Sequence, residues 1–280
     1  MHLVRPFARL LPQSVWSHLW FSGPFTVRVG PGRLRLHHGG EIIENEFFWT
    51  GTFWTERATI AYFLDLVRQA DILIDVGANI GTFALVAKVA KPELQVIAIE
   101  PSETNFAALA RNIRINGFDI QALNAAVTAT DGPVTLYDFA GVSYSASLES
   151  DWREGTVARQ VDGLSLDTVT AGVPDNGQRI LLKIDVEGHE PQALAGARKL
   201  IARRQRAAFV IELIRDPVVD AVVKLLPAGT YRYLLVDEEA GTLTDLTESM
   251  ASKSPRRHGN YVIVPDGWSV PSRPPRMVSR

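Results

Sequence analysis

Short apolar runs alternate with amphipathic segments along most of this 280-residue chain. Four runs have the length and composition of strands buried on both faces of a sheet, at residues 72–76, 95–99, 180–184 and 207–213. Around them lie segments with apolar residues at helical spacing, at residues 58–70, 82–89, 103–116, 191–204 and 218–226. Strands that alternate with helices form parallel sheets covered on both faces. The sequence therefore predicts an α/β fold with a doubly wound, mostly parallel sheet.

The remaining segments have weaker patterns. Residues 120–127 and 133–139 are predicted to be strands, and two late strands are expected at 231–236 and 260–264. The polar stretch 140–162 carries no periodicity, and we expect it to be irregular.

The chain divides into an N-terminal extension (1–57), a main domain (58–265) and a tail rich in proline and arginine (266–280). Five aromatic residues fall within 47–54. We expect them to pack the extension against the domain, and the alternative is that they form one wall of a substrate pocket.

Charge and composition narrow the function classes. With 29 basic and 31 acidic residues the net charge is -2, which gives no general attraction to nucleic acid. No apolar stretch is long enough for an integral membrane segment. Cysteine is absent, which removes disulfides, thiolate nucleophiles and cysteine-ligated metals from consideration. A cytoplasmic location is expected.

Chemistry-bearing residues follow the predicted strands. In an open α/β sheet, ligands bind outside the carboxyl ends of the strands. Gly77 and Gly81 follow the first strand, where glycine permits a tight turn and close approach of a ligand. Glu100 ends the second strand, 23 residues past Gly77. A carboxylate there can accept hydrogen bonds from both hydroxyls of a ribose, so the pair predicts a nucleoside-containing cofactor.

The turn between residues 77 and 82 discriminates between cofactors. A dinucleotide fingerprint needs glycine where this chain has Asn79 and Thr82, and no lysine with a serine or threonine follows Gly81 to make a P-loop. A looser turn that opens with Asp75 suits a cofactor with an amino-acid ammonium in place of phosphates. Such a cofactor is S-adenosylmethionine, whose positive charges favour a nearby carboxylate.

Three segments of the sequence resemble the FkbM family of methyltransferases: IDVGANIGTF at 74–83, AIEP at 98–101 and LKIDVEGHE at 182–190. Weaker matches elsewhere extend the resemblance over residues 55–265. It implies the class I (Rossmann-like) methyltransferase fold, S-adenosylmethionine as the methyl donor, and O-methylation of natural products or sugars. It also implies a cofactor site that contains Asp75, Gly77, Ala78, Asn79, Gly81, Glu100 and Ala126.

The segment 183–190 concentrates groups able to assist methyl transfer, namely Lys183, Asp185, Glu187, His189 and Glu190. A hydroxyl acceptor must lose its proton, which is a task for a histidine or a carboxylate. We expect Asp185 at the methyl-donor end and Glu187 or His189 as the base.

Each of these residues also has a purely structural interpretation. Lys183 could only neutralise buried acids, Glu187 could cap the following helix, and His189 could be a turn residue. Upstream, Glu56 either reaches the ligands or is a helix-start carboxylate favoured by the dipole. The acids and the histidine could together ligate a divalent ion, but the resemblance does not require one and we expect no metal.

The leading hypothesis is therefore a methyltransferase that acts on a hydroxyl of a small molecule. The alternatives are a nicotinamide-dependent oxidoreductase or epimerase, and a non-catalytic nucleoside-binding module. The first alternative requires the middle glycine of the dinucleotide fingerprint, and this chain has Asn79 there. A non-catalytic module has no physical need for carboxylates at successive strand ends. The sequence indicates neither the acceptor nor the oligomeric state.

Overall fold

An eight-stranded sheet forms the centre of the computed structural model, which describes residues 12–40, 42–139, 147–148, 156–174, 176–202, 207–251 and 258–272. Across the sheet the order is β12 (Thr242–Asp245), β11 (Tyr231–Asp237), β13 (Gly259–Pro265), β10 (Ala207–Leu213), β9 (Ile180–Ile184), β3 (Ile72–Val76), β4 (Gln95–Ile99) and β5 (Gln121–Leu123). Strands β5, β4, β3, β9 and β10 are parallel, and β13 runs antiparallel to β10. The predicted doubly wound, mostly parallel sheet is confirmed.

The strand order reverses between β3 and β9. From β3 the chain adds β4 and β5 on one side, then returns to place β9 and β10 on the other. At such a switch point the connections leave in opposite directions, and a crevice opens at the carboxyl ends of the two strands. The turn after Val76 and the turn after Ile184 therefore lie side by side.

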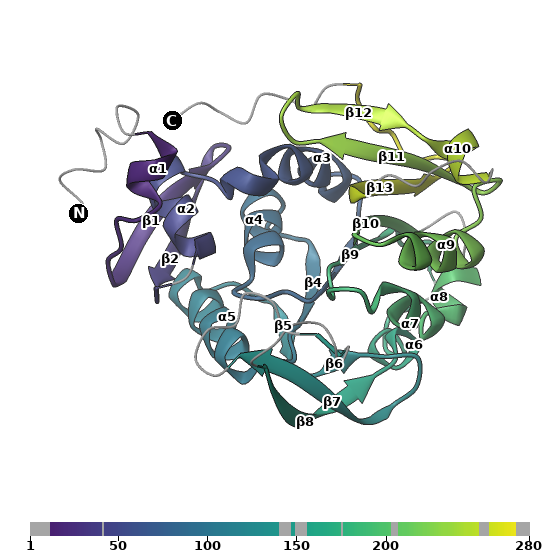
Figure 1. The fold of residues 1–280 in the computed structure, drawn as a ribbon, viewed down its shortest axis with the longest axis horizontal. Helices are drawn as coiled ribbons and strands as arrows, with labels where there is room; N and C mark the ends of the chain where they lie inside the picture. Colours follow the sequence, from purple (N-terminus) through teal and green to yellow (C-terminus); the bar gives the residue numbers. More distant parts are fainter. Residues whose placement is uncertain are drawn as a thin grey trace.

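Helices cover both faces of the sheet (Figure 1). On one face lie α3 (Arg57–Val67), α4 (Thr82–Ala90) and α5 (Glu103–Asn116), whose apolar residues share a core with alternate residues of the strands. The opposite face is covered by α6 (Leu166–Val169), α7 (Glu190–Ala195), α8 (Arg198–Ala202) and α9 (Asp216–Leu225). Strands buried on both faces explain why the four central apolar runs are continuous rather than alternating.

The N-terminal extension packs on the α4–α5 side of the domain, at the left of Figure 1. It contains α1 (Gln13–Trp16), the hairpin β1 (Gly23–Val29) and β2 (Gly32–His38), α2 (Ile42–Thr50) and the short helix η2 (Trp54–Glu56). Phe48 is completely buried in the same core as α3 and α4, as the packing interpretation of the aromatic group expects. Phe53 instead lines the cavity described below.

Two predictions of secondary structure, at 120–127 and 140–162, are wrong in part. The single strand expected at 120–127 is two strands: β5 ends at Leu123, and β6 (Ala126–Val127) joins a separate sheet with β7 (Gly132–Phe139) and β8 (Thr156–Leu164). Between the two strands, the Asn124 side-chain amide donates to the Glu100 carbonyl at 2.8 Å. The stretch 140–162 is also not wholly irregular, since residues 156–162 belong to β8 and pair with β7.

The helix expected at 191–204 is interrupted. It divides into α7 and α8 at Gly196, where a Cβ would overlap the carbonyl oxygen of Thr128. The sequence pattern did not indicate β1, β2, β12 or α10 (Thr247–Ala251).

Residues 1–11, most of 140–155 and the last part of the tail, 273–280, lie outside the described residues. Within the described ranges, every helix falls short of the length and hydrophobicity that a bilayer crossing demands.

Candidate functional site

A cavity of about 230 Å³ opens at the carboxyl ends of β3, β4, β9 and β10. Its walls come from the N-terminal extension, the turn after β3, the strand ends and the β6–β7 region. The lining includes Phe53, Glu56, Gly77, Ala78, Asn79, Phe83, Glu100, Ala126, Val127, Lys183, Asp185, Glu187 and Glu212. The predicted site therefore coincides with this cavity at the switch point of the sheet.

Backbone geometry explains the glycine at position 77. Gly77 has a φ of 74°, and a Cβ there would overlap the carbonyl oxygen of Asp185 on the neighbouring strand end. Only glycine allows the turns after β3 and β9 to approach this closely. Gly81 has a φ of 96°, but a Cβ there would meet Leu109 and Leu85, so its role is helix packing rather than contact with a ligand.

Glu100 fixes the turn after β3. Its Oε2 accepts a hydrogen bond from the Asn79 amide at 2.8 Å, and its Oε1 accepts one from the Ser102 amide at 2.9 Å. Asn79 has a φ of 51°, which directs this amide at the carboxylate. Burial raises the pKa of Glu100 to about 7, although these hydrogen bonds favour the ionised form. The carboxylate also lines the cavity, so it can contact a ligand directly.

Asp75 lies outside the cavity lining in the structure. Its side chain is buried under α4, where Oδ2 accepts a hydrogen bond from the Ala84 amide at 2.9 Å. Burial raises its pKa to about 6 against the opposing effect of Lys183, its neighbour across β3 and β9. In the structure, Asp75 thus supports the turn from below, and its assignment to the cofactor site stays a prediction.

Lys183 and Asp185 form an ion pair at the end of β9. Nζ of Lys183 lies 2.9 Å from Oδ2 of Asp185, and the ammonium also lies 4.6 Å from the centre of the Phe83 ring. Burial opposes the charge on Lys183, but the carboxylates of Asp185, Glu56 and Asp75 outweigh it and raise the pKa of Lys183. Both residues of the pair line the cavity.

The turn after β9 separates Glu187 from His189. Glu187 has a φ of 54° and lines the cavity, whereas His189 lies at the start of α7, outside the cavity lining. Glu190 is buried and accepts hydrogen bonds from the Val186 and Gly188 amides. The turn therefore separates His189 from the cavity residues Lys183, Asp185 and Glu187.

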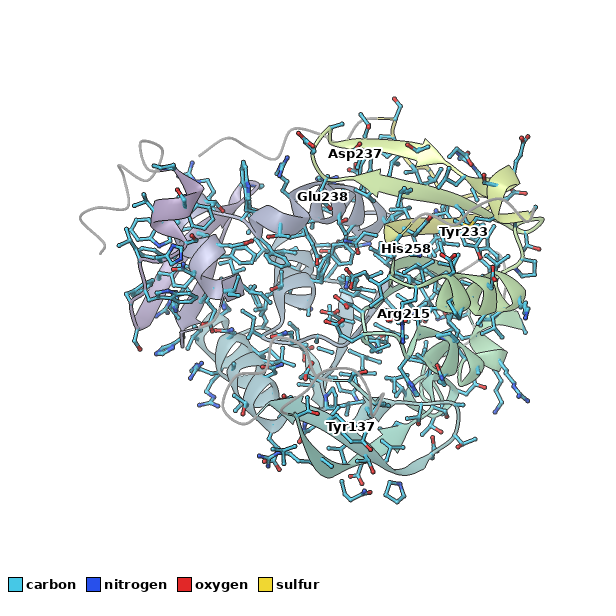
Figure 2. The ribbon with its side chains drawn as sticks, viewed as in Figure 1. Tyr137, Arg215, Tyr233, Asp237, Glu238 and His258 are labelled. Carbon is cyan, nitrogen blue, oxygen red and sulfur yellow. The ribbon has the colours of Figure 1, made fainter. Side chains whose placement is uncertain are left out.

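Gly188 packs against the guanidinium of Arg215, which lies near the centre of Figure 2. Gly188 has a φ of 100°, and a Cβ at this position would overlap the Arg215 guanidinium. This packing holds the turn that carries Glu187.

Two further carboxylates join the cavity from other elements. Glu56, which precedes α3, and Glu212, near the end of β10, both line it. Burial raises the pKa of Glu56 to about 7 and that of Glu212 to about 9. From the sequence, Glu56 had two open interpretations and Glu212 was not predicted as a site residue. The available signal was an acid inside an otherwise apolar strand, the same signal that Asp75 gives.

Comparison with known proteins identifies the family of this site. The model of the Methyltransferase FkbM domain matches residues 75–233, which contain the turn after β3, Glu100 and the β9 turn. The chain belongs to the FkbM methyltransferase family. It is therefore an enzyme, an S-adenosylmethionine-dependent methyltransferase, as the resemblance implied.

Curated relatives of this FkbM-family chain include the 31-O-demethyl-FK506 methyltransferase FkbM of Streptomyces tacrolimicus. The two are 30% identical over 234 residues, which cover 69% of this chain and 86% of the relative. Methyltransferase sdnD of Sordaria araneosa is 29% identical over 153 residues, 44% of this chain and 59% of that protein. Among solved structures, Methyltransferase FkbM from Methylobacillus flagellatus is 17% identical, with a TM-score of 0.47, over 79% of this chain and 52% of that one.

For the FkbM-family chain, the structure brings most of the predicted site residues together. Of the expected cofactor residues, Gly77, Ala78, Asn79, Glu100 and Ala126 line the cavity, whereas Asp75 and Gly81 do not. Of the expected catalytic residues, Lys183, Asp185 and Glu187 line it and His189 does not. Among the described residues, no group of three or more histidines and acids is arranged to hold a metal ion.

Proposed function

We propose that this enzyme transfers a methyl group from S-adenosylmethionine to a hydroxyl of a small molecule, with the cofactor bound across the strand ends of the cavity. The observation that carries the proposal is the position of Glu100 on the cavity wall, beside a turn that only Gly77 permits. A carboxylate at the end of the second strand is suited to hold both hydroxyls of a ribose.

The residues present fit an adenosine-bearing cation. Ala126 and Val127 offer an apolar wall beside Glu100, which suits an adenine ring. Asp185 directly follows β9 and Glu100 directly follows β4, with β3 between the two strands. Neighbouring strands lie about 4.8 Å apart, so the backbones at these residues are roughly 10 Å apart. This spacing supports our assignment of the positively charged half of the cofactor to the acidic groups after β9, two strands from its ribose.

Bound in this cavity, S-adenosylmethionine supplies an electrophilic methyl group. The protein then has to orient an acceptor oxygen in line and accept its proton. We assign proton acceptance to Glu187, which lines the cavity, in preference to His189, which does not. Lys183 holds Asp185 in place through their ion pair.

An oxygen acceptor is supported by one relative. The Streptomyces protein is named for 31-O-demethyl-FK506, an acceptor that is methylated on oxygen. We extend this reaction type, though not that acceptor, to the present enzyme. A cytoplasmic location and the absence of a nucleic-acid partner remain predictions from the sequence.

Calorimetric titration with S-adenosylhomocysteine tests the cofactor assignment, with NADH titrated in parallel. We expect saturable binding of the first and none of the second, and a folded protein that binds neither would refute the proposal. Incubation with S-adenosylmethionine and hydroxylated acceptors, starting with 31-O-demethyl-FK506, then tests the reaction through release of S-adenosylhomocysteine and a mass gain on the acceptor. Methylation only at nitrogen or carbon would contradict the assigned reaction type.

A further inference from the structure

Glu56 is a cavity carboxylate that the proposed reaction does not use. It precedes α3, where a carboxylate ordinarily caps the helix by accepting hydrogen bonds from its first amides. Here the Ala58 and Thr59 amides donate instead to Glu238, at 2.7 and 2.9 Å. Glu56 makes no side-chain capping bond. The helix-start interpretation of Glu56 therefore does not explain its position.

The Glu56 side chain lines the cavity with one carboxylate oxygen that has no hydrogen bond to any described residue. This oxygen, Oε2, is buried. The preceding residue is held firmly, since the amide of Thr55 donates to Glu46 at 3.1 Å and its hydroxyl donates to the same carboxylate at 2.6 Å. An anchored backbone with an unsatisfied buried oxygen indicates that a ligand group completes the site.

The charge balance around Glu56 favours a cation as that group. The cationic side chain that acts on it is Lys183, and Lys183 is already paired with Asp185. Four acidic residues also act on Glu56 and oppose its charge, namely Asp185, Glu238, Glu46 and Glu212. One lysine thus serves several carboxylates, which leaves acidic charge without a counter-ion in the described part of the cavity.

We propose that Glu56 makes the centre of the cavity selective for a positive charge, so that the sulfonium of the methyl donor binds in preference to its neutral demethylated product. This inference rests on the proposed use of S-adenosylmethionine in this cavity. Methyl transfer removes the sulfonium charge, and Glu56 then loses its counter-ion. The selectivity would favour donor binding before the reaction and product release after it.

Sinefungin provides a probe that requires no acceptor, because it carries an ammonium where S-adenosylmethionine carries its methylated sulfur. The measurement is the ratio of the dissociation constants of S-adenosylhomocysteine and sinefungin, by calorimetry at about pH 6 and pH 8. Burial raises the pKa of Glu56 to about 7, so its charge develops within this range. Preference for sinefungin should therefore increase with pH. Titration of Glu100 in the same range affects both ligands and cancels in the ratio.

Glu56→Gln keeps the shape of the side chain and removes its charge. We expect this variant to lose about tenfold in sinefungin affinity at pH 8, to keep its affinity for S-adenosylhomocysteine, and to lose the pH dependence of the ratio. Glu93→Gln is the matched control, because Glu93 is exposed and lies just before the amino end of β4, away from the carboxyl ends that form the cavity. It should leave both affinities unchanged.

The outcomes separate this inference from the proposed function. If the wild-type protein binds neither ligand, the cofactor assignment itself fails. If it binds both with a ratio that neither pH nor Glu56→Gln alters, the charge selectivity is overturned while the cofactor assignment stands. Equal loss of both ligands in the variant would assign Glu56 to the amino-acid ammonium that they share, and would also overturn the selectivity.

Discussion

Nζ of Lys183 lies 2.9 Å from Oδ2 of Asp185, and the pair joins the interior of the sheet to the open cavity. The Lys183 side chain is 2% exposed and that of Asp185 is 26% exposed. Asp75 lies next to Lys183 across the strands, so one buried ammonium stabilises acids on both sides of the switch point.

Lys183→Met should destabilise the protein by about 3–5 kcal/mol at neutral pH, because it leaves buried carboxylates without a counter-ion. The loss should be smaller near pH 5, where Asp75 and Glu56, whose pKa values are raised to about 6 and about 7, take up protons. Urea denaturation measures both values. Adding Asp185→Asn should recover part of the loss, and a Lys183→Met protein as stable as wild type would show that the pair contributes little.

Gly77→Ala should destabilise the protein and abolish binding of S-adenosylhomocysteine. The added methyl would overlap the Asp185 carbonyl and force β3 and β9 apart at the cavity. Gly117→Ala is the control, since Gly117 also has a positive φ but no atom within 4 Å of a new Cβ. The control should cost only about 1 kcal/mol of backbone strain and preserve binding. Equal effects of the two substitutions would argue against the close contact.

Glu100→Ala should weaken binding of S-adenosylhomocysteine by about 1–3 kcal/mol, through loss of charge-assisted hydrogen bonds. It should also lower stability, because the Asn79 and Ser102 amides lose their acceptor. Glu100→Gln keeps one acceptor oxygen and should have a smaller effect on stability than on binding. Calorimetry and urea denaturation separate the two effects, and unchanged affinity in both variants would remove Glu100 from the cofactor site.

Glu212 should make the enzyme less stable as the pH rises. Burial, followed by repulsion from Asp185, raises its pKa from the ordinary value near 4.5 to about 9. Between these values the folded state retains a proton that the unfolded chain releases, so the free energy of unfolding falls with increasing pH. Glu212→Gln resembles the protonated group and should flatten this dependence. Urea denaturation of both proteins at about pH 6 and pH 8.5 measures how the free energy of unfolding changes with pH. The same change in wild type and variant would contradict the raised pKa.

Glu238 caps α3 from a distant part of the chain, the turn between β11 and β12 (Figure 2). Asp237 fixes this turn by accepting hydrogen bonds from the Glu239 and Ala240 amides. Glu238→Ala should cost about 1–2 kcal/mol, the usual effect of losing a helix cap. Glu239→Ala, on the same turn, should have little effect. Differential scanning calorimetry compares the melting temperatures of the two variants. Equal melting temperatures would show that Glu238 does not stabilise the start of α3.

The sequence pattern predicted the central strands correctly because local residue patterns determine where these strands form. Strands β3, β4, β9 and β10 coincide with the four apolar runs, since burial on both faces favours apolar side chains at nearly every position. The exceptions, Asp75, Lys183 and Glu212, lie near the carboxyl ends of their strands. Helix α5 was also predicted with its bounds, and Gly117 ends it with a φ of 65°. The failures had non-local causes. β8 is mostly exposed, has no alternating burial pattern and pairs with β7 along its length. Gly196, at the helix break, lies too close to the Thr128 carbonyl oxygen to carry a side chain.

The candidate site divides in the same way. Gly77, Asn79 and Glu100 could be selected from the sequence because a strand end, a turn and a second strand end follow a fixed spacing. The position of His189 could not, since the turn at Glu187 and Gly188 directs the chain into α7 and leaves that ring outside the cavity. Asp75 shares a segment with the turn but faces α4.

By itself, the sequence determined the alternation of strands and helices, because periodicity and turn residues act over short distances. It also predicted which end of the strands carries the cavity and that a nucleoside-containing cofactor binds there. Only the tertiary structure decided which acids share the cavity. Glu56 and Glu212 are 156 residues apart and reach Lys183 only after the sheet has assembled. Their charge states depend on burial and on neighbours from other elements, and no local pattern encodes these.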